Sequence, residues 1–329
     1  MAAVSASAPD NPTAGIVFIL IGSVAISLND MLIKALSDGY PLHQAVFTRS
    51  AIGIFFSLFM VQMEGGWRIL RTDRPGLHAL RCLAVIIANM TFFAALAVLP
   101  LASATALFFV APLLITLLSI PLLGEKVGPR RLTAVAIGFV GVLVMLDLGG
   151  DRAADAPALW VLLLPVLAAF GYALMQILTR KLGANAKPSA MAVYIQGGFI
   201  LVSLLFWAVA GDGRYAEGVE EESLIVLLRA WRWPEPEDQL LFLALGANSA
   251  VIGYTLSAAY RAADAAVIAP FEYVVLPLAI LWGWTFWGEL PGPRIALGIA
   301  LIMGAGIYVF ARERARGRVV AAKRPVRRY

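Results

Sequence analysis

The chain has 329 residues, of which 60% are hydrophobic and only 14% are charged, and its formal net charge is +5. Soluble domains carry about 25% charged residues, so this composition excludes an ordinary soluble globular protein. The single cysteine, Cys82, excludes an intrachain disulfide and a Cys-rich metal site, and the two histidines, His43 and His78, lie in separate apolar stretches, which argues against a histidine cluster.

Ten apolar stretches of close to 20 residues follow one another along the chain, separated by short polar loops. About 20 apolar residues, at a rise of 1.5 Å per residue, cross the hydrocarbon core of a bilayer as one helix. The stretches lack the period-2 alternation typical of barrel strands. The sequence therefore predicts an all-α polytopic membrane protein with ten transmembrane helices, over 14–36, 42–63, 77–98, 101–123, 131–148, 158–180, 188–209, 239–260, 264–287 and 294–311.

The loops and tails carry an uneven distribution of charge. With ten spans both termini lie on one side, and that side holds 19 of the lysines and arginines against 6 on the other. Positively charged loops stay in the cytoplasm. We therefore expect a multi-pass protein of a bacterial-type inner (plasma) membrane, with an N-terminal tail (1–13) and a basic tail (312–329) that are both cytoplasmic. The positive charge reflects topology, and no nucleic-acid partner is expected.

The longest loop, 210–238, lies on the extracytoplasmic side in this topology. It is rich in acidic residues and contains Trp231 and Trp233. Tryptophans are enriched at membrane–water interfaces. We favour a solvated loop with an interfacial tryptophan pair over a lid that closes a binding site.

The two halves of the chain resemble each other. Residues 124–130 (GEKVGPR) match residues 288–294 (GELPGPR) at five of seven positions, 164 residues apart. Earlier in each half the offset is 147, which places Asn29, Lys34 and Arg49 at positions equivalent to Gln176, Lys181 and Gln196. We expect two five-helix repeats, 14–148 and 158–311. Because five is odd, the second repeat is inverted in the membrane, and inverted repeats are the physical basis of alternating access.

Two segments, LPLASATALFFVAPLLITLLSIPLLGEKVGPRRLTAVAIGFVGVLVML (99–146) and APFEYVVLPLAILWGWTFWGELPGPRIALGIALIMGAGIYV (269–309), resemble the EamA-type drug/metabolite transporter superfamily. The resemblance covers about 14–311. It implies a ten-helix 5+5 inverted repeat in the inner membrane, with a central cavity lined by helices 1–4 and 6–9. Members of the superfamily move amino acids, nucleotide-like metabolites, vitamins such as riboflavin, or S-adenosylmethionine, some inward and some outward.

Three ionisable residues lie within predicted spans and away from the span ends, and such residues are functional candidates because their insertion is costly. Asp30 and Arg49 have similar depths on either side of the first hairpin, so we expect them to pair, with Lys34 contributing one turn from Asp30. The pair is either structural, holding an outer gate, or Arg49 exchanges Asp30 for a substrate carboxylate or phosphate. Glu272 lies in the sequence Pro-Phe-Glu-Tyr. It couples a proton or recognises a cationic or N–H-rich substrate, or else it bonds a backbone group freed by the proline or a Ser/Thr of a neighbouring helix.

Neutral polar side chains are the remaining candidates for a binding site. Amides read the edge of a heterocycle and tyrosines stack on planar rings. The alternative for each residue is an interhelical hydrogen bond worth about 0.6 kcal/mol. The candidates are Asn29, Asn89, Tyr172, Gln176, Tyr194, Gln196, Asn248 and Tyr254.

Two further patterns have structural interpretations. Trp282, Trp284 and Trp287 at one end of the ninth helix are typical of an interfacial aromatic belt, which we favour over a binding box. The spacings Ala134/Gly138 and Ala300/Gly304 allow close helix contact. We expect a monomer or a weak homodimer.

These observations together favour a secondary transporter of a small organic metabolite that works by alternating access. A membrane enzyme would need a catalytic cluster, and no nucleotide-binding Gly-x-x-x-x-Gly-Lys-Ser/Thr loop is present. We expect no enzyme activity, cofactor or metal. The mixture of amide and aromatic residues suits a planar, largely neutral vitamin such as riboflavin, with S-adenosylmethionine or an amino acid as the alternative. The expected partners are this substrate, the lipid bilayer and a proton as the candidate coupling ion.

Overall fold

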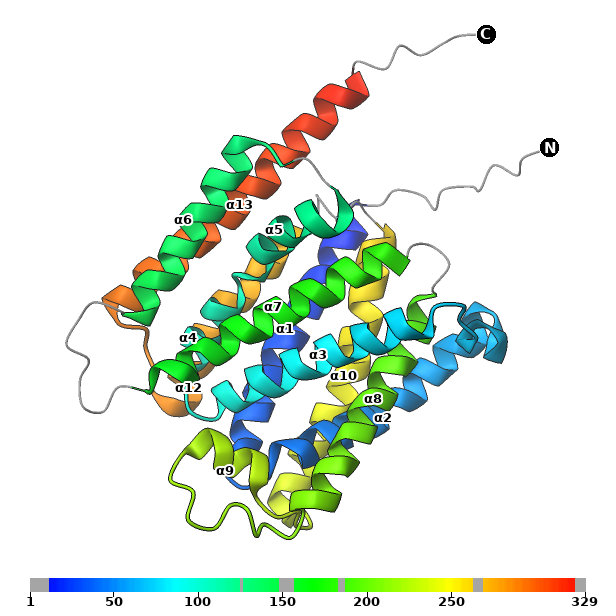
Figure 1. Ribbon diagram of the computed structural model, residues 1–329, viewed down its shortest axis with the longest axis vertical. Helices are drawn as coiled ribbons and strands as arrows, with labels where there is room; N and C mark the ends of the chain where they lie inside the picture. Colours follow the sequence, from blue (N-terminus) through cyan, green and yellow to red (C-terminus); the bar gives the residue numbers. More distant parts are fainter. Residues whose placement is uncertain (1–11, 125–126, 148–156, 183–186, 263–268, 323–329) are drawn as a thin grey trace.

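The computed structural model describes residues 12–124, 127–147, 157–182, 187–262 and 269–322 (Figure 1). These residues form helices and contain no strand. In chain order the elements are α1 (Pro12–Ser37), α2 (Leu42–Glu64), η1 (Gly66–Leu70), α3 (Pro75–Leu96), α4 (Leu101–Phe108), α5 (Ala111–Leu123), α6 (Pro129–Leu146), α7 (Leu159–Leu182), α8 (Pro188–Ala210), α9 (Glu222–Leu228), α10 (Pro236–Ala262), η3 (Ala269–Val274), α12 (Val275–Trp287) and α13 (Pro293–Ala322).

The long helices begin and end within a few residues of most of the predicted spans. Seven stretches of the described helices are long and apolar enough to cross a membrane, and three more apolar helices are shorter, namely Leu132–Leu146, Phe271–Trp287 and Pro293–Val309. Proline is the first residue of α3, α6 and α8. Its fixed φ and missing N–H suit the first helical turn, where that N–H would have no partner.

Two of the predicted helices are interrupted. The predicted helix 101–123 is α4 followed by α5, and Pro112 in the first turn of α5 has no N–H to bond back across the break. The predicted helix 264–287 is η3 followed by α12 in its described part. Phe109 and Tyr273, which are equivalent at the offset of 164, lie at the two breaks, and their ring centroids are 5.2 Å apart. The interruptions of the two halves therefore meet each other.

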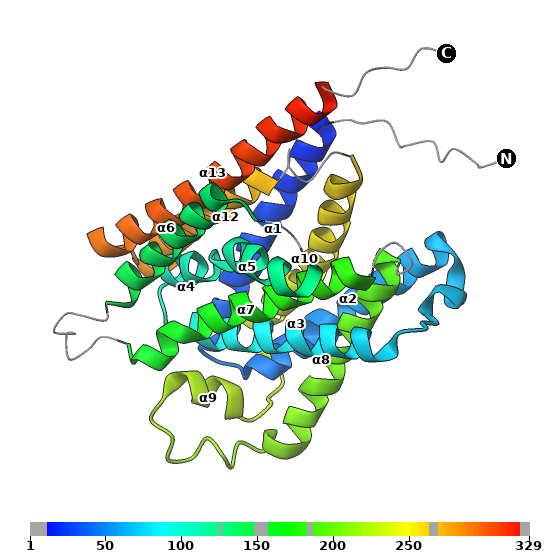
Figure 2. The same ribbon diagram turned by 45° about the horizontal axis from the view of Figure 1, so that its top comes forward.

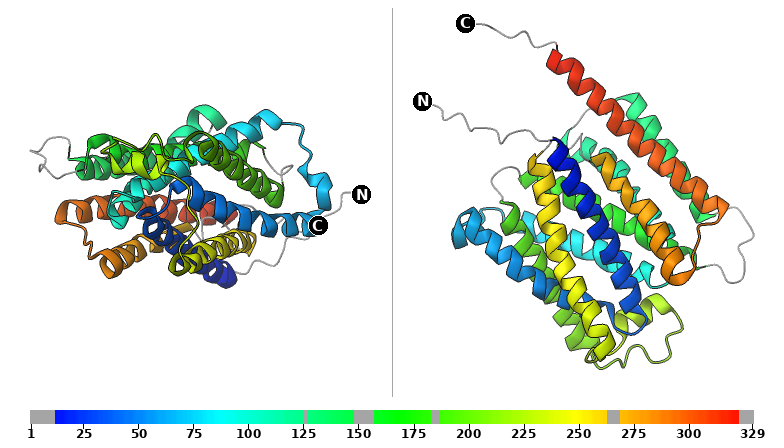
Figure 3. Two further views of the ribbon diagram at one scale, coloured as in Figure 1. Left: turned by 90° about the horizontal axis from the view of Figure 1, so that it is seen from below. Right: turned by 180° about the vertical axis from the view of Figure 1, so that it is seen from behind.

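The helices pair across the two halves of the chain. The most extensively packed pairs are α3 with α7, α1 with α10, α2 with α8 and α6 with α13. By the repeat offsets, α1 is equivalent to α7, and α3 is equivalent to α10. The α1–α10 pair of helices is therefore equivalent to the α7–α3 pair. The α2–α8 and α6–α13 pairs each join two equivalent helices. The α6–α13 pair lies at one side of the bundle, where the two helices run beside each other (Figures 1 and 3).

Glycines allow α6 and α13 to pack closely against each other. A Cβ built on Gly141 would lie 3.0 Å from the Gly298 carbonyl oxygen, so these two glycines allow the close approach. Gly138 faces Leu113 and Ala305, whereas Gly304 has open space around it. Of the two expected small-residue spacings, only the one at Gly138 lies in a tight contact within the chain.

The helices run between two ends of the molecule. The hairpin end holds the α1–α2 turn (38–41) and the segment 211–235, and the termini end holds the start of α1, the end of α13 and η1 (Figures 1 and 2). The segment 211–235 is folded against the bundle rather than free in solvent. Its helix α9 buries Ser223 and Val226, and Trp231 is half-buried between His43 and Trp207, whereas Trp233 is 86% exposed. Only Trp233 therefore has the exposure expected of an interfacial residue.

Candidate functional site

At the hairpin end, a buried lysine joins the two halves of the chain. Lys34 on α1 is 5% exposed, and its Nζ lies 3.1 Å from Oε1 of Glu289 in the α12–α13 turn. The same ammonium donates hydrogen bonds to the carbonyls of Leu99 (2.8 Å) and Leu96 (3.3 Å), and it lies 5.3 Å from the ring centroid of Trp287. The buried ammonium thus has a carboxylate, two carbonyl oxygens and an aromatic ring as partners, and a buried charge needs such partners to be stable.

Glu289 is the second half of this junction. Its Oε2 accepts a hydrogen bond of 3.1 Å from the Leu101 N–H at the start of α4, where the helix has unpaired donors. Gly288 before it ends α12 with a φ of 67°, a left-handed conformation that glycine adopts without strain. The expected contribution of Lys34 to an Asp30 pair is therefore replaced by a bond to the repeated Gly-Glu turn.

A second set of bonds holds the segment 211–235 and the start of α10 on the α1–α2 turn. Tyr40 donates to Asp238 Oδ2 (2.6 Å) and accepts from the Glu235 N–H (2.9 Å). Gln44 donates to the Arg232 carbonyl (2.7 Å), and Arg229 donates to the Asp38 carbonyl (2.7 Å). Burial, together with the hydrogen bond donated to Asp238, raises the pKa of Tyr40 above its ordinary value.

Arg49 lies between two aromatic rings in the middle of the bundle. Its Cζ is 5.3 Å from the ring centroids of both Phe93 and Phe199, a geometry that favours a cation. Arg49 Nη1 donates to Asn29 Oδ1 at 3.4 Å, and Asn29 Nδ2 donates to Asp30 Oδ1 at 3.2 Å. Asn29 thus bridges Asp30 and Arg49, and the described residues contain no direct ion pair between them.

Two more of the candidate amides lie around Arg49. Asn248 on α10 donates to the Ala25 carbonyl of α1 (2.7 Å), one turn before Asn29. Gln196 on α8 packs against the α2 backbone, because a Cβ built on Gly53 would lie 2.7 Å from Gln196 Nε2. Gln196 Oε1 is buried without a hydrogen-bond partner in the described part of the chain. Four elements, α1, α2, α8 and α10, therefore bring amides and one guanidinium together.

A second group of candidates lies near the helix breaks. Tyr172 on α7 accepts a hydrogen bond of 2.7 Å from Gln176, and its ring centroid is 5.5 Å from that of Phe108 at the end of α4. Glu272 in η3 is half-buried and lies within electrostatic range of the Tyr172 and Tyr273 hydroxyls. Paired helix interruptions in two halves of a membrane protein are the strongest sequence-level indication of a binding site.

The remaining candidates are placed elsewhere. Asn89 donates to the Val85 carbonyl of its own helix (3.0 Å). Tyr194 lies at the termini end, where its hydroxyl donates to the Leu70 carbonyl (2.5 Å). Tyr254 is 48% exposed and its ring packs edge-on against Phe18.

The three tryptophans of α12 divide between α1 and the surface. Trp282 donates to Ser27 of α1 (3.2 Å), and Trp287 contacts Lys34. Trp284 is 58% exposed. Only Trp284 has the outward position typical of an aromatic belt.

Two residues of the site do not follow from the sequence argument. Glu289 belongs to the repeated Gly-Glu pair, and this repetition was a signal that could have marked it as a candidate. Arg81, near the start of the predicted span 77–98, is not among the predicted candidates, yet it is only 6% exposed within α3. Its guanidinium donates to Thr179 Oγ1 of α7 (2.6 Å) and to the Met191 carbonyl of α8 (3.5 Å). No cluster of three His, Cys, Asp or Glu side chains that could hold a metal ion occurs in the described residues.

Comparisons with known proteins give a consistent result. The sequence model of the EamA-like transporter family matches residues 13–147. A riboflavin transporter of Rhizobium johnstonii is 30% identical over 94% of this chain and 95% of its own length, and one of Vibrio cholerae is 31% identical over 88% of each. An S-adenosylmethionine uptake transporter of Rickettsia prowazekii is 24% identical over 91% of this chain and 93% of its own. A solved crystal structure shares the fold, with a TM-score of 0.60, 21% identity, and coverage of 91% of this chain and 98% of that chain.

Proposed function

Since the chain belongs to the EamA-like transporter family, we propose that it is a secondary transporter that takes up riboflavin across the bacterial inner membrane. The observation that carries this proposal is the match to relatives named as riboflavin transporters over nearly the whole chain. Family membership favours transport rather than catalysis.

The surroundings of Arg49 have the chemistry that a flavin requires. An isoalloxazine ring is flat and aromatic, and its pyrimidinedione edge has two carbonyl acceptors and one N–H donor. Phe93 and Phe199 surround the site with aromatic rings, the Arg49 guanidinium between them donates to carbonyls, and Gln196 Oε1 is an acceptor without a partner in the described residues. We assign the central binding role to Arg49, Asn29 and Gln196.

The transport mechanism that we propose is the rocking of two inverted five-helix repeats about this centre. The pairing of helices across the halves and the meeting of Phe109 with Tyr273 support a pseudo-twofold axis through the helix breaks. The outer gate is the Lys34–Glu289 pair, because it ties α1 to the α12–α13 turn and to α4. The bridged Asp30–Asn29–Arg49 group then belongs to the binding site rather than to the gate.

Two further assignments complete the proposal. The termini end is cytoplasmic, since the excess of lysine and arginine lies there. Glu272 is the coupling group, because a carboxylate beside the η3–α12 break, within electrostatic range of the Tyr172 and Tyr273 hydroxyls, can carry a proton. Coupling through Glu272 predicts that uptake collapses when the proton gradient is dissipated.

The second candidate substrate is S-adenosylmethionine, which the Rickettsia relative favours. Its carboxylate would pair with Arg49, and its ammonium or sulfonium group would lie near Glu272. The two substrates make different demands on Arg49, because riboflavin needs a donor of neutral hydrogen bonds whereas a carboxylate needs a positive charge.

Uptake of labelled riboflavin by proteoliposomes tests the proposal, with unlabelled S-adenosylmethionine as the competitor. Riboflavin uptake that S-adenosylmethionine does not inhibit is the expected result. Arg49→Ala should abolish uptake, and Arg68→Ala, which removes an exposed arginine at the termini end, is the matched control that should retain it. Uptake of S-adenosylmethionine without uptake of riboflavin would replace the substrate, and uptake of neither would overturn the proposal.

A further inference from the structure

The connections that precede α3 and α10 share a Trp-Arg pair at the repeat offset of 164. Trp67 and Arg68 lie in η1, between α2 and α3, and Trp231 and Arg232 lie between α8 and α10. The same offset relates the two Gly-Glu turns, and the Trp-Arg match extends it to the connections before α3 and α10. The two pairs therefore occupy equivalent positions in the two halves of the chain.

At the hairpin end, the tryptophan of this pair is docked on the bundle. The Trp231 ring stacks on the His43 ring, and their centroids are 5.8 Å apart. It also lies 5.2 Å from the ring of Phe47, near the start of α2, and 6.0 Å from the ring of Trp207, near the end of α8. Trp231 thus holds its connection against α2 and α8 through contacts with three rings.

At the termini end, the equivalent tryptophan is not docked. The Trp67 side chain is 62% exposed, and it has no ring contact or hydrogen bond among the residues that the structure describes. Gly65 and Gly66 come directly before it with φ of 139° and 70°, which glycine adopts readily and other residues do not. The equivalent positions in the second half are Arg229 and Ala230. Trp67 therefore follows a glycine hinge that the second half lacks.

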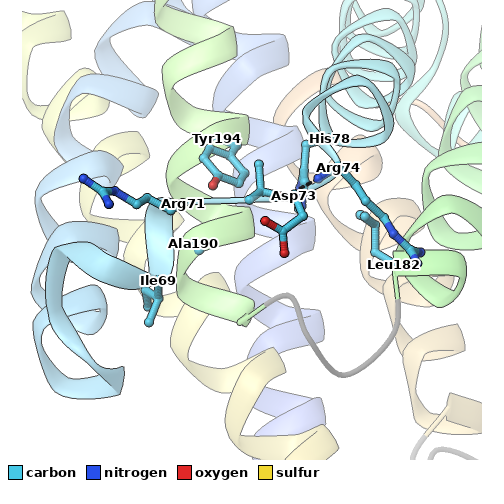
Figure 4. A pocket seen from close by; sticks show the side chains of 9 residues that line it. Ile69, Arg71, Asp73, Arg74, His78, Leu182, Ala190 and Tyr194 are labelled. Atoms are coloured by element: carbon cyan, nitrogen blue, oxygen red, sulfur yellow. Dashed lines mark hydrogen bonds between the residues drawn. The ribbon is translucent and has the colours of Figure 1, made fainter.

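A cavity of about 90 Å³ lies at the start of α8, beside η1 and α3 (Figure 4). Two residues of its wall, Ala190 and Tyr194, are equivalent at the offset of 147 to His43 and Phe47, which hold the docked tryptophan at the hairpin end. Ile69 of η1, two residues beyond the exposed tryptophan, also lines the cavity. A single water needs roughly 10–15 Å³ of such space, so the cavity has room for several waters or for part of one large side chain.

We propose that Trp67 enters this cavity when the termini end closes, in the way that Trp231 is docked at the hairpin end. The proposal rests on the alternating-access mechanism proposed above, and it does not depend on the identity of the substrate. In the docked position the indole contacts the Tyr194 ring, as Trp231 contacts Phe47. These ring contacts and the burial of the indole stabilise the closed state of the termini end.

The two docked states differ in the arginine of the pair. At the hairpin end, the Arg232 guanidinium lies 4.8 Å from the centroid of the Tyr40 ring, a favourable cation–π contact. The residue equivalent to Tyr40 is Lys187, so Arg68 has no equivalent ring to contact. Docking at the termini end therefore involves the tryptophan alone, and we expect it to be weaker than docking at the hairpin end.

Quenching of a bimane fluorophore by tryptophan on contact tests this proposal. The thiol-reactive label is placed at the exposed Lys187, before the start of α8, in the full-length variant Cys82→Ser/Lys187→Cys. Glu289→Gln is then added to break the proposed outer gate, because opening of the hairpin end accompanies closing of the termini end in alternating access. We expect the bimane fluorescence to fall in the Glu289→Gln variant, and we expect Trp67→Phe to abolish this fall.

Two further variants control the assignment. Trp284→Phe removes another exposed tryptophan, on α12, and should leave the quenching unchanged. Ala190→Leu fills the cavity and should prevent the quenching that depends on Trp67. Quenching that persists in Ala190→Leu would place the indole elsewhere and would overturn the proposal.

The distance between spin labels at Asp38 and Leu290, measured in parallel, separates the two ways in which quenching can fail. A longer distance in the Glu289→Gln variant, without quenching that depends on Trp67, overturns the docking of Trp67 and leaves the outer gate in place. An unchanged distance without such quenching overturns both the gate and the docking.

Discussion

Lys34 and Lys181 occupy equivalent positions in the two halves of the chain, yet their surroundings differ. Lys34 is buried and bound to Glu289 and to two carbonyls at the hairpin end. Lys181 at the termini end is exposed and has no hydrogen bond or ion pair within the described residues. The same residue type in related sequence therefore has different partners at the two ends. Glu125, which is equivalent to Glu289 at the offset of 164, lies outside the described residues.

Other equivalent positions sharpen the comparison. Gly124 and Gly288 have the same left-handed conformation, with φ of 70° and 67°, so the turns after α5 and α12 are alike. At the centre, Arg49 in the first half faces Gln196 in the second. The halves thus share their backbone turns and differ in where they place charge.

The largest effect is expected from breaking the buried lysine pair. Lys34→Gln leaves the Glu289 carboxylate without its cation, and removing one partner of a buried pair costs about 3 kcal/mol of the free energy of unfolding. Lys181→Gln should change it by less than about 0.5 kcal/mol, as is usual for surface substitutions. Denaturant unfolding in detergent measures both values. Equal losses of unfolding free energy for the two substitutions would mean that Lys34 and Lys181 contribute equally to stability, which would contradict the difference between their surroundings.

The next largest effect concerns the centre. Arg49→Gln makes the two halves alike there, and it removes the cation between Phe93 and Phe199. Hydrogen bonds to charged groups contribute about 1.5–3 kcal/mol, so riboflavin affinity should fall roughly 10- to 100-fold. Gln196→Ala should weaken it less than about 10-fold. Quenching of flavin fluorescence on binding measures both, and a larger loss for Gln196→Ala would assign the site mainly to the second half.

Substitution of the glycine that ends α5 and of the glycine that ends α12 should reduce stability by the same amount. Gly124→Ala and Gly288→Ala each force an alanine into the left-handed region, at a cost of about 1 kcal/mol. A Cβ at either position meets no atom within 4 Å, so no steric clash adds to that cost. Thermal unfolding of the two variants should give the same shift in Tm. A clearly larger shift for one of them would show that the repeats differ in their backbone as well as in charge.

An effect of the same size as that of the glycine variants is expected at Tyr40, whose equivalent by the offset of 147 is the exposed Lys187. Tyr40→Phe removes the bonds to Asp238 and Glu235 and should cost about 1 kcal/mol at neutral pH. Because the pKa of Tyr40 is raised above its ordinary value, the unfolded chain ionises first as pH rises above about 10, and stability falls. The difference between parent and variant should therefore shrink above pH 10. A difference that is constant with pH would contradict this ionisation.

The sequence predicted the helices and the family well because hydrophobic length and repeated motifs are local signals. The break at Phe109–Val110 was not predicted, since the apolar run continues through it, whereas the Pro-Phe-Glu-Tyr sequence indicated the distortion that the structure has in η3 before Val275. The depth argument brought Asp30 and Arg49 near each other, but it did not reveal that Asn29 stands between them. The pairing of Lys34 with Glu289 joins residues 255 positions apart, and only the packing of the two halves determines such a contact.

The central claim is that the Lys34–Glu289 pair is the outer gate and holds the hairpin end closed. Spin labels at exposed positions, Asp38 with Leu290 and Arg68 with Lys181, report the two ends in a Cys82→Ser background. Double electron–electron resonance in nanodiscs then compares the parent with Glu289→Gln. The account predicts that Glu289→Gln lengthens the 38–290 distance and shortens the 68–181 distance. If both distance distributions stay unchanged, the pair is a structural contact and not a gate.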